Sequence, residues 1–137
     1  MNYEKASQYT KKFEGLNLLP YTCPTGHLTI GYGHNLEEGI TLEMAETLLQ
    51  ADLRLAEMEV SSKVAYFNKL DEARQFVLVD MCFNMGLKKL FTFKKFFAAL
   101  LKRDYPVAAR EMLNSKWAVQ VGNRAKKLAE IMRTGEY

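Results

Sequence analysis

Residues 14–34 read EGLNLLPYTCPTGHLTIGYGH, and this stretch decides how the chain folds around an early carboxylate. Glu14 opens it, and no residue from Leu16 to Leu36 is charged if both histidines are neutral. The Pro-Thr-Gly tripeptide at its centre is a turn signal between two runs rich in Thr, Tyr and aliphatic residues. We therefore predict a small β-hairpin layer, with Cys23 on one arm and Thr29 on the other.

Helical periodicity surrounds this hairpin on both sides. Apolar residues from Tyr3 to Phe13 predict a first helix that ends at Gly15. Thr41 is placed to cap a longer helix, whose apolar stripe runs to about Val60. Further helices are predicted over about 71–85 with Gly86 as the stop, from a cap at Thr92 to Arg103, from Pro106 to near Leu113, around Trp117 and over 123–133. The fold class is α+β, mostly α, with a small N-terminal lobe joined by the long helix to a larger helical lobe.

Composition predicts one globular domain. The chain has 137 residues, of which 48% are hydrophobic and 26% charged, and this excludes disordered and collagen-like classes. A charged N-terminus without a following apolar run predicts no signal peptide and a cytosolic start. No apolar run is long enough for a membrane span. Cys23 and Cys82 form no CxxC motif, so we expect two free thiols, no metal site and no cofactor.

Charge is distributed unevenly along the chain. Residues 1–80 carry 12 acidic and 7 basic side chains, whereas residues 81–137 carry 4 acidic and 12 basic side chains. A basic C-terminal part favours an acidic partner, whether nucleic acid, an anionic wall glycan or membrane headgroups. The alternative is a solvated lysine-rich face without a partner. We find no nucleic-acid-binding motif, which argues against the first of these partners.

Glu14 is the first candidate catalytic residue, because it has the apolar residues Phe13 and Leu16 close by in the sequence. Apolar neighbours desolvate a carboxyl and favour its protonated form, as a general acid requires. A tight turn folds both hairpin arms back toward this helix end, so Glu14, Cys23 and Thr29 are predicted to line one small cleft. The alternative is a solvated carboxylate, a small buried thiol and a strand-forming threonine.

The same residues carry a family resemblance. Glu14, eight residues, Cys23, five residues and Thr29, followed by IGYGH, resemble the active-site pattern of phage-type lysozymes of glycoside hydrolase family 24, which has Asp or Cys at the second position. The resemblance continues in MCFNMG at 81–86, SKW at 115–117, NRAKK at 123–127 and RTG at 133–135. It implies a single lysozyme-like domain over 1–137, with a small lobe over about 14–41, a spine helix over about 42–60 and a helical lobe over about 61–137 on which the first helix packs. The connection after His34 is shorter than in T-even phage members.

The resemblance implies hydrolysis of the β-1,4 bond between N-acetylmuramic acid and N-acetylglucosamine in peptidoglycan. Glu14 is then the acid that protonates the leaving oxygen, and Thr29 helps to hold the attacking water. Glycoside hydrolysis usually needs two carboxylates, but Cys23 takes the place often held by Asp. An ordinary thiol has a pKa of about 8.5 and is mostly neutral at pH 7. Cys23 is therefore a water positioner, a thiolate or a nucleophile, and we favour the positioner with inversion at the anomeric carbon.

Further roles follow from the resemblance alone. It implies substrate-binding roles for Asn35, Phe83, Asn84 and Arg124, and Arg124 is also the expected ion-pair partner of Glu14. His34 and Asp52 are expected to form a structural pair. Trp117 is interpreted as a core anchor, because a lone Trp at helical spacing more often packs than binds sugar.

The resemblance also implies the partners. We expect the chain to act as a monomeric endolysin on peptidoglycan glycan strands, without nucleic acid or membrane insertion. It is expected to start in the host cytoplasm and to depend on a holin for access to the wall in the periplasm. The alternatives are a lytic transglycosylase, which leaves 1,6-anhydro products, and a non-catalytic wall-binding homologue.

Overall fold

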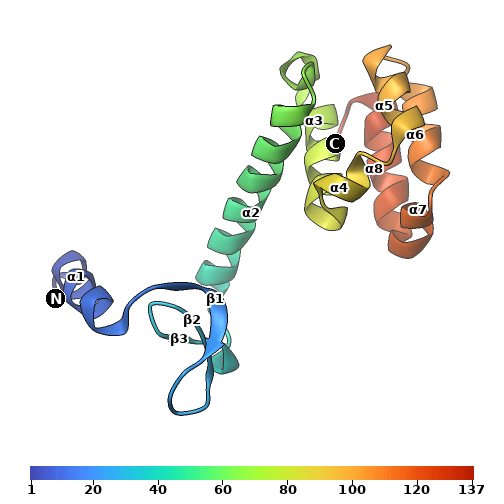
Figure 1. The fold of residues 1–137 in the computed structure, drawn as a ribbon. Coiled ribbons are helices and arrows are strands. Elements are labelled where there is room, and N and C mark those ends of the chain that lie inside the picture. The colour runs from blue at the N-terminus through green and yellow to red at the C-terminus, as the bar shows by residue number, and fades with distance from the viewer. The chain divides into compact units, whose positions relative to one another are not determined.

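The computed structural model describes all 137 residues and divides into two compact units, Met1–Thr47 and Leu48–Tyr137. The first unit holds one helix, a small sheet and the start of a long helix, and the second holds helices only (Figure 1). The predicted mostly α, α+β class is confirmed. The first helix belongs to the N-terminal unit, and its predicted packing on the helical lobe stays a prediction.

The N-terminal unit is built around a three-stranded antiparallel sheet in the order β1-β2-β3. Thr29 of β2 pairs with Tyr21 of β1, and Ile30 pairs with His34 of β3. The predicted hairpin is confirmed, and a short third strand extends it. The elements are α1 (Tyr3–Glu14), β1 (Asn17–Thr22), β2 (Leu28–Gly31), β3 (His34–Asn35), the 3-10 helix η1 (Leu36–Glu38) and the first residues of α2 (Leu42–Lys63).

Helix α1 has well-defined ends. The Asn2 side chain accepts a hydrogen bond from the Lys5 N–H at 2.9 Å, and the helix ends at Gly15, which adopts a φ of 70°. This backbone conformation favours glycine, as a helix stop requires. No residue of α1 is buried, and Phe13 is 84% exposed.

Helix α2 is the longest helix of the chain. Thr41 caps it as predicted, because its hydroxyl accepts the Met44 N–H at 3.2 Å. The helix runs three residues beyond the predicted end, and its buried residues are Ala56 and Val60. None of the protein's helices combines the length and apolar character that crossing a membrane requires.

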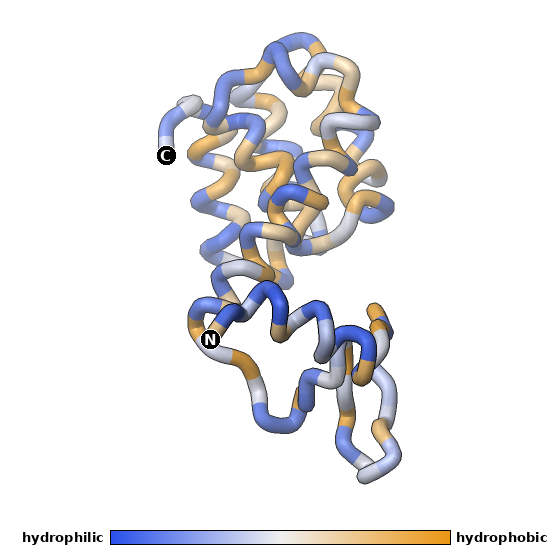
Figure 2. Tube along the Cα trace, turned by 90° about the vertical axis from the view of Figure 1, so that its left-hand side faces the viewer, coloured by the Kyte–Doolittle hydropathy of each residue, from blue (hydrophilic) through white to orange (hydrophobic).

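The C-terminal unit is a cluster of amphipathic helices, along which hydrophobic and hydrophilic residues alternate (Figure 2). Its elements after α2 are η2 (Phe67–Lys69), α3 (Glu72–Met85), α4 (Leu87–Leu90), α5 (Lys94–Leu101), α6 (Tyr105–Leu113), α7 (Lys116–Val121) and α8 (Asn123–Thr134). Helix α8 packs against both α3 and α6. The largest fully buried side chains are Phe96, Leu78, Met81, Leu90, Leu100, Met112 and Met132.

Local end signals predicted most of these helices. Gly86 ends α3 as expected, and Pro106 lies in the first turn of α6. The structure adds two caps, Asp71 at the start of α3 and Asp104 at the start of α6. The predicted cap at Thr92 is wrong. Its hydroxyl donates instead to the Lys89 carbonyl at 2.6 Å, which closes the turn after α4, and α5 starts only at Lys94.

Arg74 joins α3 to the end of α8 and is 11% exposed at its side chain. Its Nε donates to the Met132 carbonyl at 2.8 Å, and its Nη2 donates to the Arg133 carbonyl at 3.1 Å. Its Nη1 pairs with Asp71 at 2.8 Å, and the guanidinium lies 3.4 Å from the centre of the Tyr105 ring. One side chain thus satisfies carbonyl groups that the end of a helix leaves without partners.

Candidate active site

Glu14, the last residue of α1, lies against the turn between β2 and β3. A Cβ atom built on Gly33 would stand 2.8 Å from Glu14 Cδ and closer still to Oε2. Gly33 also has a φ of 75°, which disfavours any side chain. The carboxyl group therefore occupies space that only a glycine at position 33 leaves open.

A second contact holds α1 to the same turn. The Lys11 ammonium lies 5.3 Å from the centre of the Tyr32 ring. A cation over an aromatic face at this distance is attracted by the ring quadrupole. Lys11 is one helical turn before Glu14, so the two contacts fix the helix end from adjacent positions on α1.

Cys23 follows β1 and stands in a closed turn. Its N–H donates to the His27 carbonyl at 2.9 Å, and its own carbonyl accepts the Gly26 N–H at 2.9 Å. The Thr25 hydroxyl lies 3.0 Å from its sulfur. Hydrogen bonding from Thr25, and then from the backbone of His27, lowers the pKa of the Cys23 thiol to about 6. The thiolate form of Cys23 therefore predominates at neutral pH, whereas an ordinary cysteine is mostly a neutral thiol.

Thr29 stands opposite this turn on β2 and is 4% exposed. Its hydroxyl donates to the His27 carbonyl at 2.9 Å. The structure thus brings two predicted catalytic residues, Cys23 and Thr29, to one backbone acceptor. Sequence reasoning placed them on facing arms but missed His27, because a backbone carbonyl leaves no signal in residue type.

The other predicted residues of this unit make local contacts. His34 Nε2 is hydrogen-bonded to the Gly39 carbonyl at 3.0 Å. The Asn35 side chain accepts the Glu37 N–H at 3.0 Å and so caps η1. Asp52 is an exposed residue of α2 in the C-terminal unit, and its pairing with His34 stays a prediction.

Asn84 and Trp117 meet in the C-terminal unit. The Trp117 indole N–H donates to the Asn84 side-chain oxygen at 2.7 Å. Trp117 is 7% exposed and belongs to the hydrophobic core, which confirms its interpretation as an anchor. Phe83, the neighbour of Asn84, is 40% exposed.

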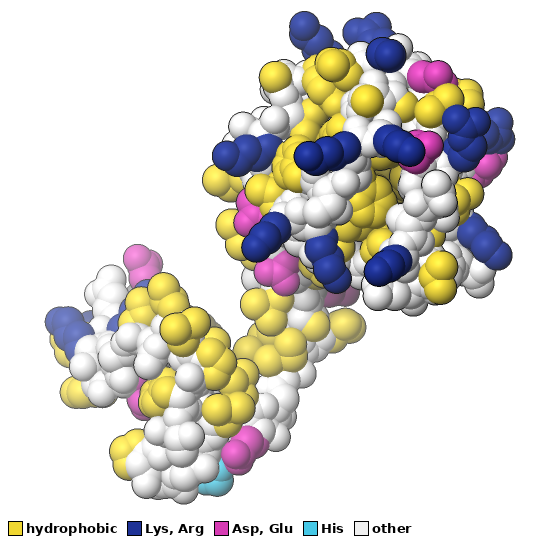
Figure 3. All heavy atoms as spheres, turned by 45° about the vertical axis from the view of Figure 1, so that its right-hand side comes forward, with side chains coloured by type: hydrophobic (Ala, Val, Ile, Leu, Met, Phe, Trp, Pro, Cys, Tyr) yellow, Lys and Arg dark blue, Asp and Glu magenta, His cyan; other side chains and the backbone are white.

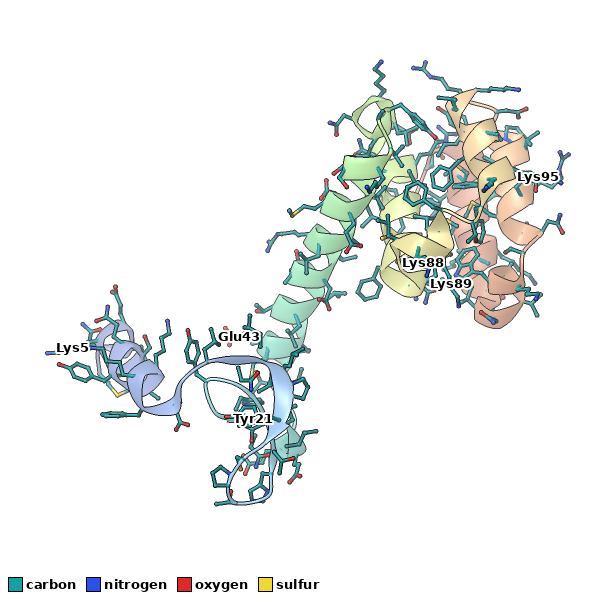
Figure 4. The ribbon with its side chains drawn as sticks, in the orientation of Figure 1. Lys5, Tyr21, Glu43, Lys88, Lys89 and Lys95 are labelled. Carbon is teal, nitrogen blue, oxygen red and sulfur yellow. The ribbon has the colours of Figure 1, made fainter.

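Asn84 and Trp117 also line a pocket of about 750 Å³ within the helical unit. Its lining includes Phe93 and Phe96, and its lysines are Lys89, Lys94, Lys95 and Lys116. Lysine and arginine side chains are spread over the face of this unit that Figure 3 shows. Lys88 and Lys89 extend from α4 and Lys95 from α5 (Figure 4). No lysine forms an ion pair within either unit, so these ammonium groups have no carboxylate partner there.

Arg124 pairs within its own unit with a carboxylate that sequence reasoning missed. Its Nε and Nη2 each donate to one oxygen of Asp80 at 2.9 Å, a bidentate arrangement. Donation of these hydrogen bonds to Asp80 raises the pKa of Arg124. The two residues are 44 positions apart, so no local motif reveals the pair. The predicted contact of Arg124 with Glu14 stays a prediction.

The second cysteine has a different environment. Cys82 is 3% exposed, and its sulfur lies 3.6 Å from Glu59 Oε2. Burial, with the Glu59 carboxylate, raises the pKa of the Cys82 thiol to about 11. Cys82 is thus a neutral core residue, as predicted. No group of three or more His, Cys, Asp and Glu side chains is placed to hold a metal ion.

The family described as phage lysozyme matches residues 11–134, which include Glu14, Cys23, Thr29 and Arg124. The chain belongs to the phage lysozyme family. Lysozymes of this family hydrolyse bacterial peptidoglycan, so the chain is a muramidase with an endolysin-type activity. The resemblance found in the sequence and the mostly helical fold are both consistent with this assignment.

Similar proteins come from cellular and phage sources. The probable T4-type lysozyme 1 of Dictyostelium discoideum is 28% identical, and the match covers 89% of each chain. The endolysin of Acyrthosiphon pisum secondary endosymbiont phage 1 is 30% identical and covers 84% of this chain and 78% of its own. The pre-baseplate central spike protein of Enterobacteria phage T4 is 27% identical over 94% of this chain, but over only 28% of its own length. The chain therefore corresponds to more than three quarters of each of the first two relatives and to one segment of the third.

Proposed function

We propose that this phage lysozyme cleaves the β-1,4 bond between N-acetylmuramic acid and N-acetylglucosamine, with Glu14 as the general acid. The observation that carries the proposal is the placement of the Glu14 carboxyl group against Gly33. It supports an exposed acid placed beside a turn that the sheet holds. A general acid must be held within hydrogen-bond reach of the leaving oxygen, and such positioning accounts for much of a catalytic effect.

In the proposed reaction Glu14 gives its proton to the glycosidic oxygen as the bond from the anomeric carbon to that oxygen breaks. The departing sugar leaves as an alcohol, and positive charge develops on the sugar ring that stays. A water molecule then adds to the anomeric carbon. The proton lost from that water is finally available to restore the acid form of Glu14.

Cys23 and Thr29 are proposed to hold that water. The Cys23 thiolate, with its pKa lowered to about 6, supplies the negative charge that an Asp supplies in other members. It accepts a hydrogen bond from the water and takes its proton during attack. Thr29 already donates its hydrogen to His27, so its oxygen accepts from the water. Attack from the face opposite the leaving group inverts the anomeric carbon.

Substrate contacts are proposed at Asn35, Phe83, Asn84 and Arg124. The half-exposed ring of Phe83 suits the apolar face of a sugar, and Asn84 has amide N–H groups free to donate. The lysines that line the pocket of the helical unit suit carboxylates of an anionic wall polymer.

Access and assembly complete the proposal. The protein acts as a monomer that starts in the host cytoplasm and reaches the wall when a holin opens the membrane. The lysines form no ion pair with a carboxylate, so they are free to bind an anionic polymer. We favour the wall over nucleic acid, because the sequence has no nucleic-acid-binding motif.

Loss of turbidity of outer-membrane-permeabilised Gram-negative cells tests the function. Glu14→Gln keeps the shape of the side chain but has no proton to give, so we expect it to abolish lysis. Glu4→Gln is the matched control, because Glu4 is an exposed carboxylate in the first turn of the same helix. Equal lysis by the Glu14→Gln variant and the unmodified protein would remove Glu14 as the acid.

Mass spectrometry of the digest distinguishes hydrolysis from lytic transglycosylation. Hydrolysis leaves a reducing muramic acid end, whereas a lytic transglycosylase, which also needs one acid, leaves a 1,6-anhydro end. We expect reducing ends only. Binding to walls without release of either end would instead indicate a non-catalytic wall-binding protein.

A further inference from the structure

His27 stands at the centre of the hydrogen bonds that hold the turn from Cys23 to Thr29. Its carbonyl accepts both the Cys23 N–H and the Thr29 hydroxyl, each at 2.9 Å. A displacement of the His27 backbone therefore moves both residues together. Any group that fixes His27 fixes the relative position of the thiolate and the hydroxyl.

The side chain of His27 is fixed by Glu37. The two are joined by a 2.9 Å hydrogen bond between His27 Nδ1 and Glu37 Oε2. The other oxygen of the same carboxylate accepts the Leu28 N–H at 3.3 Å. Glu37 thus holds the turn at two consecutive residues. Its own backbone is held by Asn35, whose side chain accepts the Glu37 N–H.

The charges around His27 make this contact sensitive to pH. The hydrogen bond from His27 to Glu37, and then the charge of Glu37, raise the pKa of His27, and the charges of Cys23 and Glu38 act in the same direction. The pKa of Glu37 is lowered by its hydrogen bond with His27. The contact therefore favours the imidazolium form of His27 and the carboxylate form of Glu37, each relative to the free side chain.

We propose that His27 and Glu37 are a positioning pair that holds the turn from Cys23 to Thr29 in its reactive geometry, an inference that rests on the proposed function. The pair has half-exposed side chains, at 52% and 53%, and exposed ion pairs contribute little to the stability of a fold. Its effect is thus local. It sets the place of the turn that carries the thiolate and supplies a positive charge that interacts with Cys23.

The sign of the pH effect follows from the raised pKa of His27. The imidazolium is present below that raised value and is lost as the pH climbs through it. Loss of the proton removes the attraction to Glu37 and the positive charge near Cys23. The positioning effect is therefore lost on the alkaline side, while protonation of the Cys23 thiolate below about pH 6 limits the acid side.

Two readouts over about pH 5 to 9 test the proposal. The first is the rate of cell-wall lysis. The second is the rate at which iodoacetamide alkylates Cys23, followed on the Cys23 peptide by mass spectrometry, which needs no cell wall. The variants are Glu37→Gln and His27→Arg. The matched control is Glu38→Gln, which removes the same charge one residue away, where no hydrogen bond is lost.

In Glu37→Gln we expect the midpoint at which the lysis rate declines with rising pH to move about 0.5 to 1 pH unit lower, because His27 loses a neighbouring negative charge. The same substitution also moves the alkylation midpoint of Cys23 above about 6. His27→Arg keeps a permanent cation and removes the part of the alkaline fall that His27 sets, while the need for a protonated general acid remains. Glu38→Gln, whose charge contributes least to the raised pKa of His27, is expected to move both midpoints by less than Glu37→Gln does.

Equal midpoints for Glu37→Gln and the unmodified protein in both readouts would overturn the proposal. A lysis rate reduced by the same factor at every pH would also overturn it, because a merely structural role predicts that result. If the unmodified protein lyses no cells, the proposed function fails, and the alkylation midpoints alone then decide whether the pair controls Cys23.

Discussion

The carboxyl group of Glu14 fills the space that a side chain at position 33 would occupy. A Cβ atom on Gly33 would lie 3.4 Å from Glu14 Cγ, 2.8 Å from Cδ and nearer still to Oε2. The glycine-rich turn and the acid are therefore one structural feature, although the two residues are 19 positions apart in the sequence. The size of residue 33 sets where the acid stands.

Replacement of Gly33 by Ala is expected to displace Glu14 rather than to unfold the protein. The Glu14 carboxyl group is the mobile end of an exposed side chain, so it rotates away from the new methyl group. The left-handed backbone adds a cost of about 1 to 2 kcal/mol. We expect the lysis rate to fall on the order of 100-fold, because misplacement of a catalytic group lowers the rate by about that factor.

Gly31→Ala is the control for that experiment. Gly31 has a similar φ of 68°, but a Cβ atom there meets no atom within 4 Å. The two variants therefore share the backbone cost and differ in the contact with Glu14. Equal lysis rates for the two, at equal stability by urea unfolding, would show that the Gly33 contact does not position the acid.

Cys23→Asp and Cys23→Ser separate the charge of the thiolate from its shape. Aspartate restores an anion, so we expect the lysis rate of Cys23→Asp to be within about tenfold of that of the unmodified protein. Serine provides no anion, so we expect the lysis rate of Cys23→Ser to be lower by about 100-fold or more. The pKa of Cys23 is about 6, so unmodified activity declines below that pH as the thiolate takes a proton. In Cys23→Asp the decline moves to about pH 4. An unchanged acid limb in Cys23→Asp would contradict a role for the thiolate.

The configuration of the first product tests the path of water. A water held by Cys23 and Thr29 attacks opposite the leaving group, so we expect inversion, which proton NMR detects on fresh product before mutarotation. Direct attack by Cys23 on the anomeric carbon would form a covalent intermediate, and its hydrolysis would give net retention. Net retention therefore rules out the positioning role and supports a nucleophilic cysteine.

Sequence reasoning found what local chemistry encodes. The ends of α1 and α3 were predictable because Gly15 and Gly86 are strong end signals. Thr92 shows the limit of such signals. A threonine hydroxyl serves equally as the cap of the next helix or as a donor to the preceding turn, and packing selected the second.

Pairs that the tertiary structure assembles were beyond prediction. Glu37 reaches His27 across ten residues because η1 folds back on the β1–β2 turn, and residue types alone do not show that path. Asp80 and Arg124 meet because α3 and α8 pack together. The positions of Cys23 and Thr29 were predictable from turn signals, but the lowered pKa of Cys23 depends on hydrogen-bond geometry that only the folded turn defines.

Loss of the Asn84 side-chain oxygen is expected to destabilise the helical unit. In Asn84→Leu the Trp117 indole N–H, in a side chain only 7% exposed, has no acceptor. An unpaired buried donor costs about 1 to 3 kcal/mol. Urea unfolding followed by Trp117 fluorescence measures the loss. Gln120→Leu, which changes an exposed residue lining the same pocket, is the control and is expected to lie within about 0.5 kcal/mol of the unmodified protein.

Arg74→Lys is expected to be the most destabilising conservative change in the helical unit. Lysine cannot reproduce a planar fork that bonds Met132, Arg133 and Asp71 at once while it stacks on a ring. We expect a loss of about 2 to 3 kcal/mol, because carbonyls at the end of α8 lose charged donors. Arg110→Lys is the matched control, since Arg110 is exposed and forms no ion pair, and is expected to change the free energy of unfolding by less than about 0.5 kcal/mol. If urea unfolding gives the two variants the same stability, Arg74 does not carry the contact between α3 and α8, and the apolar core alone must hold those helices together.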